Sequence, residues 1–165
     1  LKYFDFLNQF FKDITDPIVN SSGKIYQYVG DEVVVYWDLK DGKKDNNCVR
    51  CFFDIEKTIQ KQSAKYQKKF GFVPAFKAGY HLGQVTVGEI GVIKKDIVSS
   101  GDVLNTAARI QSLCNQHEAK VLVSKDICEL LVLETQYAQE LIGEIQLRGK
   151  QQKVALYKIE PLLVS

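Results

Sequence analysis

The sequence has no run of apolar residues that approaches the roughly 18 needed to span a membrane, and no secretory signal is visible. It contains no methionine and begins at Leu1, so we expect it to be a fragment of a longer protein. A strong charge of one sign is also absent, because 22 basic residues against 20 acidic ones leave a net charge of +2. That balance does not indicate nucleic acid as a partner.

Cysteine and histidine, the usual ligands of zinc, are scarce. Cys48 and Cys51 have the spacing of a metal or redox pair, but they fall in a helical pattern and no second pair with matching spacing follows. The other two cysteines lie in apolar contexts. The pattern favours buried free thiols in a reducing compartment over a zinc site. Of the two histidines, we expect His117 to be exposed and His81 to be structural.

A length of 165 residues, with 45% hydrophobic and 25% charged residues, is typical of a soluble domain with a sizeable core. No internal repeat, low-complexity tract or linker divides the chain. We therefore expect residues 1–165 to form a single domain.

Apolar residues spaced three and four apart predict helices, and short β-rich runs beside glycine predict strands. We expect helices over residues 3–19, about 47–70 and 102–116, and a fourth that Ser124 caps and that ends near Leu133. We expect strands over residues 24–29, 32–37, 75–80, 84–89, 120–123, 136–147 and 153–159, a short extended piece at 97–99 and a loop at 41–47. Hairpins dominate the strand pairings, so an α+β sheet with helices on one face fits better than a doubly wound parallel sheet.

The turn at Gly30 and Asp31 joins the first two predicted strands. A carboxylate on a tight turn is accessible to solvent and suits a divalent cation, although glycine followed by aspartate is also an ordinary turn pair that needs no function. Glu32 follows, and strand alternation directs it to the opposite face. The turn alone leaves both interpretations open.

Glycine is concentrated in the segments 79–83 and 88–91. Because glycine weakens a strand, this density indicates either the close approach of another backbone or ligand, or a set of turns and bulges. Near the end of the chain, Arg148 and Lys150 flank a glycine between two predicted strands. These two side chains would either bind phosphate or simply be exposed to solvent on a hairpin. Arg148 is the better candidate for binding phosphate.

The segment from Gly101 to Arg109 predicts a turn that opens into a helix. Asn105 and Arg109 are four residues apart and so share a helix face, with two small alanines between them. On one face, the planar guanidinium can bind an anion, and the amide can hydrogen-bond a group next to that anion in the same ligand. An amphipathic helix with solvated polar residues is the alternative.

Together these motifs resemble the catalytic domain of class III adenylate and guanylate cyclases. The motifs occur in the family's order and cover nearly the whole chain. They read Tyr26-Gln-Tyr-Val-Gly-Asp31, Gly79-Tyr-His-Leu-Gly-Gln-Val-Thr-Val-Gly88, Gly101-Asp-Val-Leu-Asn-Thr-Ala-Ala-Arg109 and Leu147-Arg-Gly-Lys150.

The resemblance implies a ferredoxin-like α+β domain that works as a head-to-tail homodimer, with ATP or GTP at the interface and two Mg²⁺ or Mn²⁺ ions in each complete site. It implies that Asp31 is one of two metal-binding aspartates. From the partner subunit, Asn105 would orient the ribose and Arg109 would stabilise the transition-state phosphate. Arg148 matches the basic position that holds the triphosphate, where lysine is commoner in the family.

The chain departs from the family pattern at three points. The other metal-binding aspartate normally lies on a strand before the first helix, which this chain starts too late to contain, so we expect the fragment as written to be inactive. The base-selecting position three residues before Gly30 is Gln27, where lysine or glutamate is usual. The second base-selecting position, seven residues before Asn105, is Val98, whose side chain cannot hydrogen-bond a purine.

The function expected from this resemblance is conversion of ATP to cyclic AMP and pyrophosphate. The alternatives are a guanylate cyclase and a catalytically inactive cyclase-like domain that dimerises for signalling. The hairpin sequence Val29-Gly-Asp-Glu-Val33 also resembles that of diguanylate cyclases, but those lack the helix with asparagine and arginine. The resemblance implies a domain in the cytoplasm that makes no membrane contact itself, and it is compatible with a parent protein tethered to a membrane.

Overall fold

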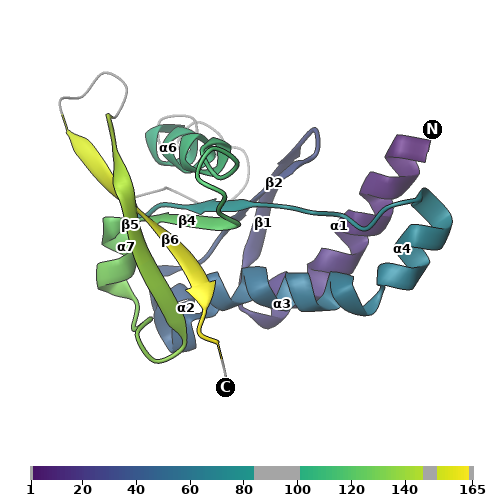
Figure 1. The fold of residues 1–165 in the computed structure, drawn as a ribbon, viewed down its shortest axis with the longest axis horizontal. Helices are drawn as coiled ribbons and strands as arrows, with labels where there is room; N and C mark the ends of the chain where they lie inside the picture. Colours follow the sequence, from purple (N-terminus) through teal and green to yellow (C-terminus); the bar gives the residue numbers. More distant parts are fainter. Residues whose placement is uncertain (1, 84–100, 147–151, 164–165) are drawn as a thin grey trace, which may run out of the picture. The chain divides into compact units, whose positions relative to one another are not determined.

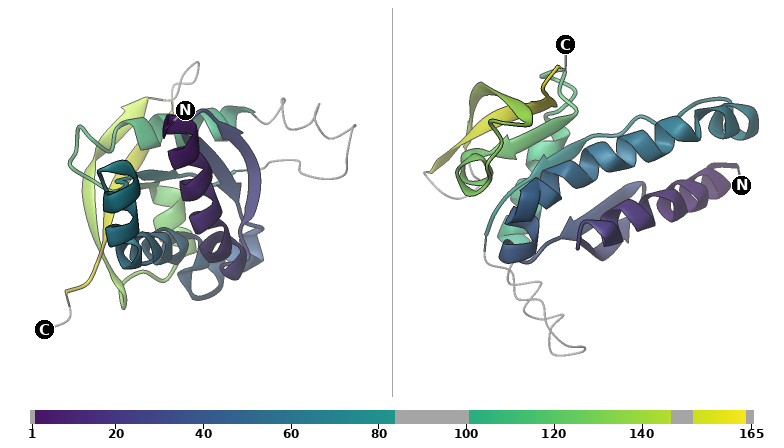
Figure 2. Two further views of the ribbon diagram at one scale, coloured as in Figure 1. Left: turned by 90° about the vertical axis from the view of Figure 1, so that its right-hand side faces the viewer. Right: turned by 90° about the horizontal axis from the view of Figure 1, so that it is seen from below.

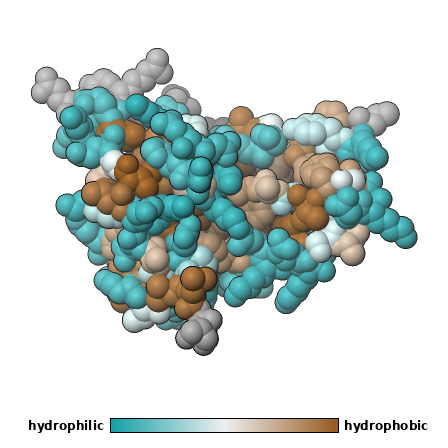
Figure 3. Space-filling view, in the orientation of Figure 1, coloured by the Kyte–Doolittle hydropathy of each residue, from teal (hydrophilic) through white to brown (hydrophobic). Residues whose placement is uncertain are grey.

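The computed structural model describes residues 2–83, 101–146 and 152–163. The chain divides into two compact units, Leu1–Ala75 and Phe76–Ser165. Within the described residues, no helix is both long enough and apolar enough to cross a membrane. In the face shown in Figure 3, hydrophilic side chains cover much of the surface and hydrophobic ones form separate patches.

The first unit combines helices with one hairpin (Figure 1). Its elements are α1 (Lys2–Asn20), β1 (Lys24–Val29), β2 (Glu32–Tyr36), α2 (Leu39–Lys43), the 3-10 turn η1 (Lys44–Asn46), α3 (Asn47–Lys61) and α4 (Ser63–Phe70). The predicted first helix and both strands of the hairpin are confirmed within one residue at each end. Strands β1 and β2 are antiparallel, and Val29 pairs with Glu32 across the turn.

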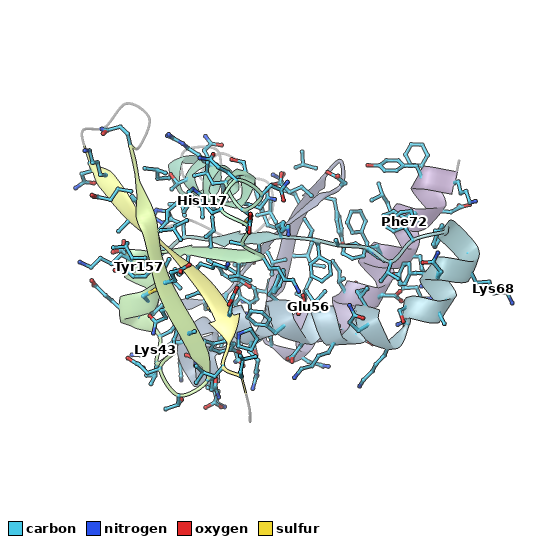
Figure 4. The ribbon with its side chains drawn as sticks, in the orientation of Figure 1. Lys43, Glu56, Lys68, Phe72, His117 and Tyr157 are labelled. Atoms are coloured by element: carbon cyan, nitrogen blue, oxygen red, sulfur yellow. The ribbon has the colours of Figure 1, made fainter. Side chains whose placement is uncertain are left out.

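The core of the first unit forms where α1 packs against α3, which run side by side in Figure 2. Residues of α1 spaced three and four apart are buried, as the amphipathic pattern predicts. Tyr66 of α4 is fully buried, and its hydroxyl donates a hydrogen bond to the Asp13 carboxylate at 2.5 Å. Phe72 lies against Phe6, with ring centroids 4.8 Å apart, whereas Lys68 points outward from α4 (Figure 4).

Two predictions for the first unit are wrong. Residues 41–47, expected as a loop, are largely helical, because the buried Gly42 lies under Trp37 and the Asn47 amide donates to the Asp41 carbonyl at 2.9 Å. The long helix expected over 47–70 is broken at Gln62, whose φ of −103° and ψ of 14° leave the helical region. Good helix formers stand on both sides of this break, so local propensity does not reveal it.

The second unit is a four-stranded mixed sheet with helices packed on it. Its elements are β3 (Ala78–Tyr80), α6 (Gly101–Ser112), β4 (Val121–Ser124), α7 (Lys125–Leu130), β5 (Tyr137–Gln146) and β6 (Lys153–Pro161). The order is β3-β4-β6-β5; β3 and β4 are parallel, and the other pairs are antiparallel. This arrangement confirms the predicted α+β class.

The core of the second unit lies between α6 and the sheet. Ile110 and Cys114 pack against Leu122 of β4 and Leu156 of β6, and all four are buried. Helix α6 ends at Ser112, earlier than predicted, because Leu113 and Cys114 donate to carbonyls three residues back and tighten the chain into a turn. Helix α7 also ends early, at Leu130. The strand predicted at 84–89 and the extended piece at 97–99 lie outside the described residues.

Candidate active site

The hairpin of the first unit places Asp31 at its tip, exposed to solvent. Gly30 precedes it with a φ of +61°, a conformation that glycine adopts without the steric penalty of a Cβ. Gln27 is also exposed, on β1, where it pairs with Val34 next to a β-bulge. The turn therefore fixes the position of one carboxylate at an open edge of the first unit.

The carboxylate of Asp31 has the chemistry that a hard divalent cation prefers, since Mg²⁺ binds oxygen ligands and often only one or two carboxylates. In the described part of the chain, no three histidine, cysteine, aspartate or glutamate side chains gather where they would hold a metal ion. Asp31 thus fits as one oxygen ligand of such an ion.

Helix α6 of the second unit carries Asn105 and Arg109, and both side chains are exposed. The Arg109 guanidinium is nevertheless anchored, because its Nη1 donates a hydrogen bond to the carbonyl oxygen of Gln146 at the end of β5. Arg148 follows Gln146 by two residues in the sequence, although it lies outside the described residues, as does Val98. The helix therefore presents an amide and a guanidinium from one rigid element.

The glycines of the segment 79–83 lie directly against α6. A Cβ on Gly79 would lie 2.3 Å from the Gln111 backbone nitrogen and 2.7 Å from the Ala107 carbonyl oxygen. For Gly79, the close approach of another backbone, one of the two interpretations of this segment, is confirmed. Sequence reasoning did not identify α6 as the approaching element. The glycines at 88 and 91 lie outside the described residues.

His81 follows β3, and its Nδ1 lies 3.0 Å from the hydroxyl oxygen of Ser124. Ser124 is fully buried at the first position before α7, as predicted, but its side chain makes no capping hydrogen bond with that helix. Burial lowers the pKa of His81, and the nearby Asp126 carboxylate acts in the opposite direction. The contact gives His81 the structural role expected of it, with a partner that the sequence did not reveal.

The four cysteines are free thiols; Cys48, Cys51 and Cys114 are buried and Cys128 is partly exposed. Burial raises the pKa of Cys48 to about 12 and that of Cys51 to about 11. The prediction of buried free thiols is confirmed for these three residues. Thiols of such high pKa are poor nucleophiles at neutral pH, so none of them belongs to the candidate site.

Comparisons with known proteins add evidence from outside the structure. The family model described as "Adenylate and Guanylate cyclase catalytic domain" matches residues 1–161. "Adenylate cyclase 2" of Rhizobium meliloti is 35% identical over 159 residues, which are 96% of this chain and 44% of that protein. "Adenylate cyclase" of Anabaena cylindrica is 24% identical over 166 residues, covering 97% of this chain and 32% of that protein. The chain thus spans less than half the length of these curated relatives.

Solved structures show the same fold. The adenylyl cyclase CyaB from P. aeruginosa has a TM-score of 0.69 at 19% identity, with 95% of this chain and 81% of that chain covered. The guanylyl cyclase Cya2 has a TM-score of 0.67 at 18% identity, with 96% and 80% covered.

The α+β fold is therefore that of a nucleotide cyclase catalytic domain. The chain belongs to the adenylate and guanylate cyclase catalytic domain family, and the resemblance found in the sequence is confirmed.

Proposed function

We propose that the protein converts ATP to cyclic AMP and pyrophosphate at sites shared between two copies in a head-to-tail homodimer. The observation that carries this proposal is the exposed pair on α6, where Asn105 stands one turn from an Arg109 that is anchored on β5. The relatives named adenylate cyclase favour ATP over GTP as the substrate.

Asp31 supplies a carboxylate ligand for Mg²⁺ or Mn²⁺ in this proposal. When bound, two such cations supply positive charge at the attacking ribose 3′-hydroxyl and at the departing pyrophosphate. Asp31 follows the positive-φ Gly30 at the hairpin tip and is exposed to solvent. The carboxylate can therefore reach a ligand without rearrangement of the turn.

The residues of the second unit act on the organic part of the substrate. The Asn105 amide donates to and accepts from the ribose, which orients the 3′-hydroxyl. The Arg109 guanidinium stabilises negative charge that develops on the phosphate under attack. Arg148 holds the triphosphate, so that all three side chains come from one chain and Asp31 comes from the other.

Base selection falls to Gln27 and Val98 in this proposal. The Gln27 amide has both a donor and an acceptor and can pair with either purine, whereas the Val98 side chain offers only apolar contact. We therefore expect the preference for ATP over GTP to be weaker than in an enzyme with a charged residue at the position of Gln27.

The decisive experiment is an assay of the protein in its natural full length with ATP and with GTP, in the presence of Mg²⁺ or Mn²⁺, with cyclic nucleotide measured by chromatography. We expect cyclic AMP as the main product. Arg109→Ala should lower kcat about 100-fold or more, because it removes charge stabilisation of the transition state. Lys125→Ala, which removes an exposed cation from the same unit, is the matched control and should keep its activity. Equal activity of Arg109→Ala and wild type would contradict the proposed role.

A catalytically inactive, dimerising cyclase domain is the second candidate. It is favoured by the base-selecting positions, where Gln27 and Val98 replace the residues usual in the family. This candidate predicts a stable dimer without turnover of either nucleotide under both metals. Preferential production of cyclic GMP would instead identify the protein as a guanylate cyclase.

A further inference from the structure

Helix α6 approaches the segment 79–83 at two glycines, of which Gly79 is the middle residue of β3 and Gly83 follows that strand. At the first, the three atoms nearest to a Cβ added to Gly79 would all be backbone atoms, the nitrogen and Cα of Gln111 and the oxygen of Ala107, all within 2.7 Å. A helix backbone cannot give way by changing a rotamer. Relief of this contact to an ordinary separation of 3.4 Å therefore requires α6 as a whole to retreat by about 1 Å.

At the second point, Gly83 lies under the first turn of α6. A Cβ there would lie 2.4 Å from Cγ2 and 3.2 Å from Cγ1 of Val103. Valine has a stiff χ1 in a helix, so its side chain has little freedom to avoid the contact. The segment 79–83 therefore supports α6 near both ends.

Asn105 and Arg109 occupy the stretch of α6 between these two supports and are exposed to solvent. A retreat of the helix from β3 would carry both side chains with it. It would also disturb the hydrogen bond between Arg109 and the carbonyl of Gln146, which belongs to a different strand. A misplacement of about 1 Å at a catalytic group can reduce a rate about 100-fold.

We propose that Gly79 and Gly83 are positioning residues, which set the separation of α6 from β3 so that Asn105 and Arg109 reach the nucleotide. The inference rests on the proposed function of those two side chains. Glycine destabilises a strand, so Gly79 in the middle of β3 needs a reason, and the close contact with α6 supplies one. Any larger residue at either position changes the placement of the helix.

The test uses the full-length protein and two substitutions, the first of which creates a clash that the second removes. Gly83→Ala should lower kcat about tenfold or more while the protein stays folded, because the clash involves only a side chain. Adding Val103→Ala removes the methyl groups that the new Cβ meets, and should restore kcat to within about threefold of Val103→Ala alone. Circular dichroism and the thermal midpoint control for folding.

Two further measurements separate positioning from general packing. In an Arg109→Ala background, Gly83→Ala should cause a much smaller additional loss of kcat, because residues that act through one another are not additive. Hydrogen exchange of residues 101–112 should speed up in Gly83→Ala and in the more severe Gly79→Ala, and return towards wild type in Gly83→Ala/Val103→Ala.

The outcomes distinguish this inference from the proposed function. A wild-type protein that makes no cyclic nucleotide would overturn the proposed function. An active wild-type protein whose Gly83→Ala variant keeps its kcat, or whose loss is the same with and without Arg109, would overturn the positioning role alone. Failure of Val103→Ala to rescue a folded Gly83→Ala variant would overturn it as well.

Discussion

Two side chains, Tyr66 and His81, are held in place by polar contacts with residues that are distant in sequence. Tyr66 donates to Asp13 across 53 residues, and His81 contacts Ser124 across 43. Both contacts involve a fully buried residue, Tyr66 in one and Ser124 in the other, so loss of either partner would leave a polar group poorly satisfied. Such pairs cannot be read from local patterns, because nothing in the spacing of a chain links positions so far apart.

The burial of His81 predicts how stability depends on pH. Its pKa is lowered by burial, so the folded protein favours the neutral ring more than the unfolded chain does. The unfolded state therefore binds more protons below the ordinary pKa of 6.5. The free energy of unfolding should be at its full value above pH 6.5 and should fall as the pH drops below it. Urea unfolding at a series of pH values measures this slope.

The Asp126 carboxylate raises the pKa of His81 and so opposes the effect of burial. Substitutions at these two positions should therefore change the pH dependence in opposite directions. Asp126→Asn should depress the pKa of His81 further and steepen the loss of stability below pH 6.5. His81→Gln, which cannot gain a proton, should flatten it. A wild-type slope in His81→Gln would show that another group is responsible.

At the scale of elements, turns and helix ends depend on a few glycines with positive φ. Gly30 at the hairpin tip has φ +61° and Gly71 at the end of α4 has φ +84°, and a Cβ at either position would meet no atom within 4 Å. The cost of a larger residue there is therefore a backbone cost alone.

Gly30→Ala and Gly71→Ala should each destabilise the protein by about 1 kcal/mol, because an L-residue in the left-handed region pays a steric penalty of that order. Denaturant unfolding measures both. Only Gly30→Ala should also reduce cyclase activity, because Gly30 sets the direction of the adjacent Asp31. Equal loss of activity in both variants would indicate that the hairpin tip has no special role.

These elements also show how far sequence patterns reach. The period of apolar residues located α1, and the glycine–aspartate pair located the hairpin turn, because both signals are local. The break at Gln62 was missed because no local propensity marks it. The helical turn at residues 39–43 was missed because it depends on the packing of Gly42 under Trp37. The ordered motifs identified the family and selected Asn105 and Arg109, but not the anchor that Gln146 provides for Arg109.

At the scale of the whole molecule, the proposed function requires Asp31 from one copy of the chain and Arg109 from the other. Asp31→Asn and Arg109→Ala should each keep no more than about 1% of wild-type activity alone. Mixed in equal amounts and allowed to exchange, they should recover about a quarter of wild-type activity, because half of the dimers are mixed and each mixed dimer has one intact site of two. Activity of the separate and mixed proteins at equal total concentration measures this.

The control for that experiment is a chain with both substitutions, which should restore no activity when it is mixed with either single variant. Native mass spectrometry establishes that mixed dimers form. Mixed dimers without recovered activity would rule out a site built from two chains.

The hydrogen bond from Arg109 to the Gln146 carbonyl has a thermodynamic consequence for ligand capture. A free arginine side chain carries about 2 kcal/mol of rotamer entropy, which a ligand must normally overcome when it orders the chain. Here part of that freedom is already lost in the unliganded protein, while the other N–H groups of the guanidinium stay available for an anion. The exposed Arg109 is thus preorganised by its own chain. A lysine at this position has a compact ammonium and lacks the planar guanidinium, whose several N–H donors let one side chain bind both the carbonyl and the anion.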